Sequence, residues 1–354
     1  MLDLESVSVW ERLKKAKNPI LLYGMGNGAD KILSAFEQYG ICCSGVFASD
    51  GFVRGHTFHG FSVLSYSEAC HRFGNFVIVL AFAVFRREML EWIAALSEKH
   101  ELYAPDVPVV GEELFTPEYL YKHYGKIQKV YDFLPDKQSK LVYRNVLNFK
   151  ISGKVEYLKK CETESEKIYQ ELFVLQDRER YLDLGAYNGD TIREFIRYAP
   201  GYEQIIALEP DEKNFKKLIC FLEQQNIPRA KAYQYVAWSQ REMLSFAGRA
   251  GRNSAVSNAG TETVQAESID HVLSGEPVTF IKMDVEGAEQ EALLGGAKTL
   301  RQYAPKLKIA AYHRSGDMFE LPLLIKKINP EYEIYFRHHP YIPAWETNLY
   351  CKVC

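Results

Sequence analysis

The sequence lacks the features that mark nucleic-acid-binding proteins. Its 43 Lys and Arg residues are outnumbered by 46 Asp and Glu residues, the formal net charge is -3, and no long basic run occurs. A protein that binds a polyanion usually carries a basic patch or stripe, so we expect no nucleic-acid partner.

Long apolar runs and a secretion signal are also missing. The longest apolar stretch, residues 76–85, is too short to span a bilayer, and acidic residues precede the basic ones near the N-terminus. The seven cysteines are odd in number and irregularly spaced, which does not suit a disulfide framework. We therefore expect a cytoplasmic protein without a membrane partner.

The chain of 354 residues is long enough for two domains, each with its own core. Apolar segments that alternate with amphipathic helical patterns predict a wound parallel sheet in residues 1–115. Residues 116–175 are rich in Tyr, Lys and Glu and poor in Gly, and we interpret them as a helical connector. The elements predicted in these two parts are strands 20–23, 41–47 and 76–82 and helices 29–39, 86–100, 117–124, 139–149 and 164–173.

A second wound pattern occupies residues 176–354. Its predicted strands are 181–185, 204–209, 232–237, 280–285, 307–312, 333–337 and 348–353, and its predicted helices are 191–198, 212–225, 289–303 and 318–328. Because the last two strands have no helix between them, we expect an antiparallel pair that closes an otherwise parallel sheet. The predicted class is α/β, with two wound Rossmann-like domains joined by the connector.

The most informative motif follows the first strand of the second domain. Ligands of wound sheets bind at the carboxyl ends of the strands, and glycines there let the backbone approach a ligand closely. Free N–H groups of the next helix can hold a carboxylate, while Asp183 or Asp190 can meet an ammonium group. A zwitterionic amino-acid ligand fits this mixture better than a pyrophosphate. The candidate residues are Asp183, Gly185, Ala186, Tyr187, Asn188, Gly189, Asp190 and Thr191.

Two further strand ends complete the predicted ligand site. Glu209, followed by Pro210, ends the second strand and can accept hydrogen bonds from both hydroxyls of a ribose. Ala237 and Trp238 end the third strand, where the main chain and an aromatic ring can flank an adenine. The alternative is that the glycines only turn the chain and that Glu209 is a solvated strand end.

Four segments together resemble the FkbM family of methyltransferases: residues 181–191, the Lys-x-Asp-x-Glu-Gly-x-Glu block within 281–289, Tyr312-His313, and the ending 346–350. The resemblance implies a class I methyltransferase fold with a mostly parallel seven-stranded sheet. It also implies S-adenosyl-L-methionine as the donor and, usually, transfer to oxygen. By this resemblance the cofactor would be held by Asp183, Gly185 and Glu209.

The charged block can also be interpreted from strand geometry and the cost of burying charge. Lys282, Asp284 and Glu286 alternate, so in a strand they share one face, and three charges there would be costly to bury. The strand therefore ends near Asp284, which leaves Asp284 and Glu286 at the ligand-facing rim as catalytic candidates, with Asp284 also a cofactor contact. Glu289 fits the start of the next helix, where the helix dipole favours acids.

Histidines end the two strands that follow. Methyl transfer to a hydroxyl needs an aligned acceptor and often a base, and a histidine suits that task because its ordinary pKa is near neutral. His313 is the first candidate, either as the base or as a group that positions the acceptor, and His338 and His339 are weaker ones. The alternative for each is a structural hydrogen bond. Asp284, Glu286 and a histidine can instead hold a divalent cation, although nothing in their spacing demands it.

The first domain has its own glycine loop. Gly24-x-Gly26-x-x-Ala29 fits the dinucleotide fingerprint, Gly28 adds to it, and Asp50 follows about twenty residues on. Residues 56–64 look like the nucleotide-sugar-binding domains of sugar acyltransferases. Three interpretations stay open: a nucleotide or nucleotide-sugar site, an NAD site, and a Rossmann-like domain that is vestigial or that forms a homodimer.

The predicted function is O-methylation of a hydroxyl on a sugar-containing or other small-molecule acceptor, with a nucleotide sugar among the candidates. One alternative is a nucleotide-sugar or NAD-dependent oxidoreductase that uses the first glycine loop. Another is a non-catalytic nucleotide-binding protein. The oxidoreductase gives no role to the block from Lys282 to Glu289.

Overall fold

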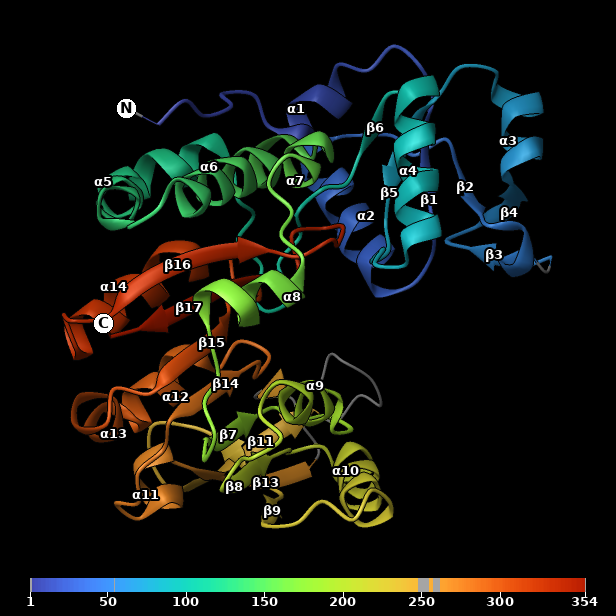
Figure 1. Ribbon diagram of the computed structural model, residues 1–354. Coiled ribbons are helices and arrows are strands. Elements are labelled where there is room, and N and C mark those ends of the chain that lie inside the picture. Colours follow the sequence, from blue (N-terminus) through green and yellow to red (C-terminus); the bar gives the residue numbers. More distant parts are fainter. Residues whose placement is uncertain (1, 54, 248–254, 257–261, 354) are drawn as a thin grey trace.

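A computed structural model describes residues 2–53, 55–247, 255–256 and 262–353. Two wound α/β sheets are joined by a group of helices (Figure 1). The fold class predicted from the sequence is confirmed. No helix within the described ranges combines the length and apolar character that crossing a membrane requires.

The first sheet has the strand order β3-β4-β2-β1-β5-β6, and its pairs are parallel except for the β3–β4 hairpin. Helices α1 and α2 pack on one face, and α3 and α4 pack on the other. The bounds are α1 Val9–Lys14, β1 Ile20–Tyr23, α2 Asn27–Tyr39, β2 Gly45–Ala48, β3 Thr57–Phe58, β4 Phe61–Ser65, α3 Tyr66–Phe73, β5 Val77–Leu80, α4 Arg87–Lys99 and β6 Leu102–Tyr103.

The sequence predicted β1, β2, β5, α2 and α4 but missed five elements of this domain. α1, β3, β4, α3 and β6 are short, with two to eight residues each, so their periodicity was too brief to recognise. Helix α3 nevertheless carries a capping box, in which the side chains of Ser65 and Glu68 each bond the other residue's backbone N–H.

The connecting helices are α5 (Pro117–Phe133), α6 (Lys137–Ser152), α7 (Glu156–Lys159) and α8 (Ser165–Lys167). α6 packs on the edge strand of the second sheet (Figure 1): Asp136 pairs with Arg337 at 2.5 Å, and Ser139 Oγ accepts the Phe336 N–H at 3.1 Å. α5 is longer than predicted because the helix continues through Gly125. A Cβ there would meet nothing within 4 Å, so no close packing or turn breaks the helix at this glycine.

The second sheet has the order β16-β17-β15-β14-β7-β8-β9, and β17 alone runs antiparallel to its neighbours. The predicted seven-stranded sheet with an antiparallel closing strand is therefore confirmed. Its elements are β7 Arg180–Leu184, α9 Asp190–Tyr198, β8 Gln204–Leu208, α10 Glu212–Gln224, β9 Ala230–Tyr233, α11 Ile269–Leu273, β14 Phe280–Met283, α12 Glu289–Gly295, α13 Ala297–Gln302, β15 Lys306–Ala310, α14 Asp317–Ile328, β16 Glu333–His338 and β17 Thr347–Lys352.

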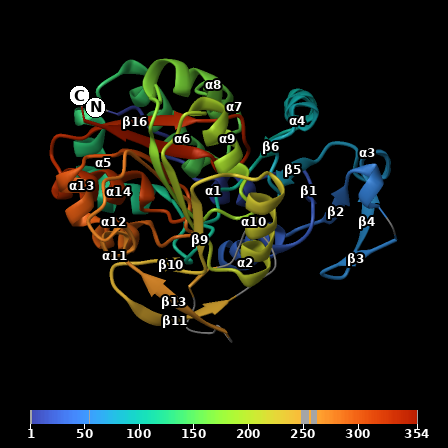
Figure 2. The ribbon, with the colours of Figure 1, turned by 60° about the horizontal axis from the view of Figure 1, so that its bottom comes forward.

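Two predicted elements are each divided in the structure. The strand 232–237 separates into β9 and β10 (Val236–Ala237), and β10 joins a small sheet with β11 (Glu242–Ala247), β12 (Ala255–Val256) and β13 (Glu262–Glu267) at one end of the molecule (Figure 2). The helix 289–303 is interrupted at Gly295-Gly296. A Cβ on Gly295 would overlap the Trp238 carbonyl, so this helix end lies directly against the strand end.

Candidate active site

A cavity opens at the carboxyl edge of the seven-stranded sheet. Most of its walls come from residues that follow β7, β8, β14 and β15, because parallel strands end at the same edge. The predicted site residues that line it are Gly185, Tyr187, Asp190, Thr191, Glu209, Pro210, Ala237, Asp284, Glu286 and His313.

The loop after β7 requires glycine at two positions. Gly185 has φ +75°, and a Cβ there would overlap the carbonyl oxygen of Asp284. Gly189 has φ +86° and begins α9, and a Cβ on it would overlap the ring of Phe221. Gly185 brings the loop against the end of β14, Gly189 brings it against α10, and the start of α9 is left beside the cavity.

Asp183 is fully buried behind the wall of the cavity rather than on its surface. Its carboxylate accepts the Thr191 hydroxyl at 2.5 Å and lies 3.1 Å from the Lys282 ammonium. Lys282 also donates to the Gly185 carbonyl at 2.6 Å, so this ion pair holds the glycine loop in place. The prediction that Asp183 binds the ligand directly is therefore corrected to support of the loop, and Asp190 remains at the cavity.

Glu209 is buried, and its carboxylate faces the cavity between two turns. One oxygen accepts the Tyr187 N–H at 2.8 Å, and the other accepts the Asp211 N–H at 3.0 Å. Burial raises the pKa of Glu209 to about 7, although these two backbone donors oppose the shift. A carboxylate oxygen has more than one lone pair, so both oxygens can also accept hydroxyls from a ligand.

The other predicted cofactor residues divide between wall and core. Ala237 lines the cavity, but Trp238 packs against the small sheet, and Tyr235, two residues before Ala237, provides an aromatic wall instead. Ala186 is buried in the core, and neither Asn188 nor Gly189 lines the cavity. Because the chain turns between β9 and β10, the aromatic residue of the wall comes before Ala237 and not after it.

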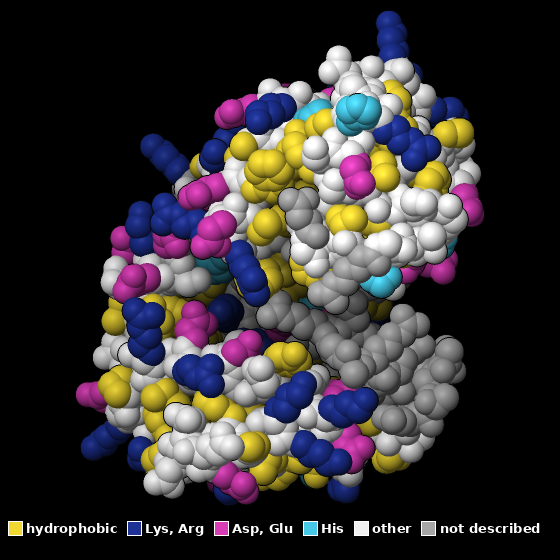
Figure 3. Space-filling model, turned by 90° about the vertical axis from the view of Figure 1, so that its right-hand side faces the viewer, with side chains coloured by type: hydrophobic (Ala, Val, Ile, Leu, Met, Phe, Trp, Pro, Cys, Tyr) yellow, Lys and Arg dark blue, Asp and Glu magenta, His cyan; other side chains and the backbone are white. Residues whose placement is uncertain are grey.

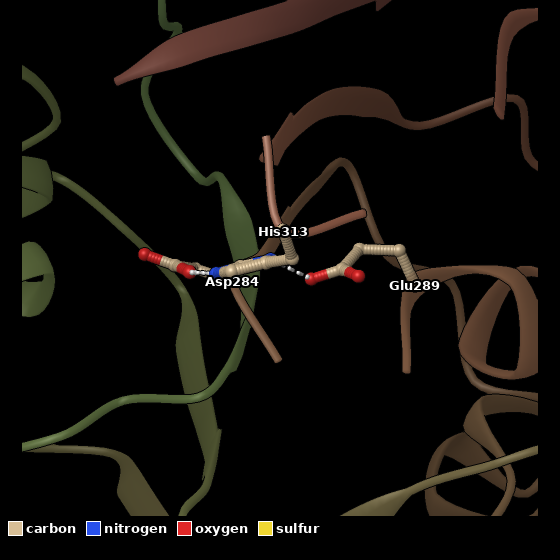
Figure 4. A group of neighbouring side chains, drawn as sticks. All are labelled: Asp284, Glu289 and His313. Atoms are coloured by element: carbon tan, nitrogen blue, oxygen red, sulfur yellow. Dashed lines mark hydrogen bonds and ion pairs between the residues drawn. The ribbon is translucent and has the colours of Figure 1, made fainter. Parts of the chain in front are cut away.

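Acidic side chains surround His313 at the ends of β14 and β15. His313 Nδ1 is 2.8 Å from Glu289, and Nε2 is 3.2 Å from Asp284, so the three side chains form a row (Figure 4). Tyr312 donates its hydroxyl to Asp284 at 3.3 Å, and Glu286 lies 3.6 Å from His313 Nε2. Glu289 also accepts the Val285 N–H at 3.0 Å, which agrees with its predicted place at a helix start.

The charges of this row correct the prediction that His313 acts as a free base. Burial lowers the pKa of His313, but Glu289 and Asp284 outweigh burial and hold it well above the ordinary value. Burial also opposes ionisation of Asp284, yet the His313 hydrogen bond and the Lys282 charge lower its pKa. His313 is therefore an imidazolium without a lone pair for a proton, and Asp284 is a stable carboxylate.

Glu286 has the titration behaviour that a catalytic base needs. Burial raises its pKa to about 8, and the charges of Asp284 and Glu289 add to this shift while His313 opposes it. The side chain is 23% exposed and lines the cavity. A carboxyl group whose pKa lies near the working pH can accept a proton efficiently.

His338 and His339 lie away from the cavity, at the end of β16. His338 Nδ1 is 3.0 Å from the Thr347 hydroxyl, and His339 bridges the Thr163 carbonyl at 2.7 Å and the Tyr350 hydroxyl at 2.8 Å. Burial lowers the pKa values of these histidines to about 3 and about 4. They are neutral and structural, so neither catalytic hypothesis for them holds.

The alternative function of the row Asp284–His313–Glu289 is to bind a divalent cation. The ligand atoms of Asp284, Glu289 and His313 lie within 4.8 Å of one another. Both imidazole nitrogens already meet carboxylates, however, and a metal-bound histidine keeps one nitrogen for the ion and donates from the other. A cation between His313 Nε2 and Asp284 would have to replace their contact, so the geometry favours the ion-paired row.

Several cavity residues were missed in the sequence. Lys308 is in register with Lys282 on the neighbouring strand, and a lysine inside an apolar strand was the signal that was available. Glu346 and Asn348 belong to the ending that carried the family resemblance but were given no role. The other lining residues that were not predicted are Val109, Asn214, Tyr235, Val236, Lys282, Met283, Val285, Tyr312, Tyr341 and Trp345.

The glycine loop of the first domain is largely explained by packing. A Cβ on Gly24 would overlap the Phe82 ring, and one on Gly28 would lie 2.6 Å from the Ala81 carbonyl. Only Gly26, with φ +98°, faces open space. Asp50 begins a short 3-10 helix, and its side chain lies outside the part of the chain that the structure describes.

The second sheet and the cavity at its carboxyl edge define a class I methyltransferase fold. Residues 183–344 match the model of the methyltransferase FkbM domain. Residues 183–344 therefore form an FkbM methyltransferase domain, as the charged block and the glycine loop predicted.

Solved structures extend the likeness beyond this domain. The crystal structure of methyltransferase FkbM from Methylobacillus flagellatus KT is similar to 98% of this chain and 94% of that one, with 20% identity and a TM-score of 0.74. The fold of both domains is therefore shared. Fibrillarin from Aeropyrum pernix, in complex with natively bound S-adenosyl-L-methionine, matches 50% of this chain and 67% of its own at 14% identity and a TM-score of 0.33. No curated protein matches the chain.

Proposed function

We propose that the protein transfers a methyl group from S-adenosyl-L-methionine to a hydroxyl of a sugar-containing or other small-molecule acceptor. One observation carries the proposal: the glycine loop, Glu209 and the acidic rim open onto a single cavity. The oxidoreductase alternative places its cofactor on the first glycine loop and gives no role to Lys282, Asp284 and Glu286, which line this cavity.

The cofactor would be held by residues of the first two strand ends. Glu209 would accept the ribose hydroxyls, the start of α9 would receive the carboxylate, and Asp190 would receive the ammonium group. The wall at Ala237 and Tyr235 would flank the adenine. The bound cofactor would supply a methyl group carried by a sulfonium. Once that methyl group is transferred, the sulfur is left as a neutral thioether.

The rim residues act on the acceptor. Asp284, held ionised by His313 and Lys282, accepts a hydrogen bond from the acceptor hydroxyl and orients it. Glu286 takes the hydroxyl proton as the new carbon–oxygen bond forms and the carbon–sulfur bond breaks. His313 is a positioning residue, because it is paired with acids on both sides.

Replacing Glu209 with Gln tests the cofactor site. This change keeps one acceptor oxygen and removes a charge-assisted hydrogen bond of about 1.5–3 kcal/mol, so we expect S-adenosylhomocysteine to bind roughly 10- to 150-fold more weakly in calorimetry. Glu212→Gln, an exposed glutamate of the next helix paired with Lys216, is the matched control and should leave the affinity unchanged. Equal affinities for both variants would contradict the assignment.

Chelation tests the role of the acidic row. Because both nitrogens of His313 are engaged by carboxylates, we expect EDTA-treated protein to keep its turnover within about twofold. Activity that is lost with EDTA and returns with Mg²⁺ or Ca²⁺ would instead favour the divalent-cation alternative.

We also propose that the protein works in the cytoplasm on a small molecule, without nucleic acid or membrane, and that its first domain can support a homodimer. The cysteines that the structure describes are all free, which suits a reducing compartment.

A further inference from the structure

The first domain reaches the cavity of the second at two places. Val109, which follows the last strand of the first sheet, lines the cavity, and Val110 donates its N–H to the His313 carbonyl at 2.9 Å. Lys31 of α2 donates to the carbonyls of Pro108 and Val109 at 2.6 and 2.8 Å. This segment therefore ties the first domain to the strand end that carries the acidic row.

The second place is the loop after β5. Val84 and Ile342 exchange backbone hydrogen bonds of 2.7 and 2.9 Å, which join this loop to the loop between β16 and β17. The Phe85 ring stacks on Tyr341 with centroids 5.8 Å apart and an interplanar angle of 16°. Tyr341 in turn lies 6.1 Å from Trp345.

These three rings form a row, Phe85–Tyr341–Trp345, that leads out of the cavity. Tyr341, which is 7% exposed, and Trp345 line the cavity wall, whereas Phe85 is 53% exposed. Glu346 and Asn348 line the same wall and offer polar groups. On the face shown in Figure 3 the molecule is hollowed between its two domains.

We propose that the acceptor is a saccharide bound between the two domains, with a sugar ring stacked on this aromatic row and its hydroxyls bonded by Glu346 and Asn348. A pyranose has an apolar face of C–H groups and a rim of hydroxyls, which matches flat rings beside a carboxylate and an amide. Phe85 makes the first domain part of the specificity site. The inference rests on the proposed methyl transfer and names its acceptor class.

The test uses the full chain saturated with S-adenosylhomocysteine. Methyl glycosides, disaccharides and UDP-N-acetylglucosamine are the probes, and binding is followed by saturation-transfer NMR and by that part of the tryptophan fluorescence change that the Trp345→Ala variant lacks. We expect at least one probe to bind through its sugar-ring protons. Trp345→Ala should weaken that binding at least tenfold and Phe85→Ala about fivefold, while the affinity for S-adenosylhomocysteine changes less than twofold.

Tyr121→Ala is the control, because this tyrosine is 84% exposed on α5 and outside the row. It should leave saccharide binding unchanged. The proposal is wrong if no saccharide binds, or if the Phe85 and Trp345 variants bind the probes as the unmodified protein does. Failure of the methyltransferase proposal has a different signature, since S-adenosylhomocysteine itself would then not bind.

Discussion

Replacing Glu286 with Gln is expected to lower kcat by about 100- to 10,000-fold, the usual contribution of a positioned base. The amide keeps the size of the side chain but cannot take the acceptor's proton. The affinity for S-adenosylhomocysteine should change less than twofold, because Glu286 belongs to the acidic rim and not to the predicted cofactor loop. Methyl transfer and cofactor binding must therefore be measured separately.

The pH dependence gives the same prediction a second readout. Only ionised Glu286 accepts a proton, so kcat/KM should rise about tenfold per pH unit below the pKa of Glu286, about 8, and level off above it. Asp284→Asn removes a negative charge that raises this pKa, so its profile should move to lower pH while its maximum falls. A flat profile for the unmodified protein would contradict the role of Glu286.

Replacing Gly185 with Ala should be the most damaging change outside the acidic rim. The residue has φ +75°, where an L-residue costs about 1–2 kcal/mol, and the added Cβ would overlap the Asp284 carbonyl, which typically costs another 1–3 kcal/mol. The loop must then move away from β14. We expect a lower midpoint in thermal unfolding and a loss of S-adenosylhomocysteine binding in calorimetry.

Gly275→Ala separates the backbone cost of a positive φ from the cost of the overlapping Cβ. Gly275 has a similar φ of +83°, but a Cβ there would meet nothing within 4 Å. Its replacement should therefore show the backbone cost alone and leave cofactor binding intact. If the two variants unfolded at the same temperature and bound equally well, close approach of Gly185 to β14 would not be required.

The sequence predicted those parts of the site that depend on local order. Alternating apolar and helical segments located the strand ends, so Glu209, Asp284 and His313 were correctly expected at one edge of the sheet. The sequence could not show which charged partners the buried side chains have. Asp183 became a partner of Lys282, and His313 became a cation, because residues distant in sequence surround them.

Contacts between the domains were also beyond the sequence. The aromatic row joins Phe85 to Tyr341, which are far apart in the chain, and no spacing rule connects them. The division of the predicted strand 232–237 into β9 and β10 has a similar cause, because Val236 pairs with Ala266 of the small sheet. Such tertiary pairings override local periodicity.

The hydrogen bond from the Val110 N–H to the His313 carbonyl joins the first domain directly to the acidic rim of the second domain. If a ligand stabilises one arrangement of His313 and its acids, we expect it to stabilise also the segment that Lys31 holds, and the reverse follows because coupling between two sites is reciprocal. We therefore expect that mutations in α2 can alter turnover without touching either substrate.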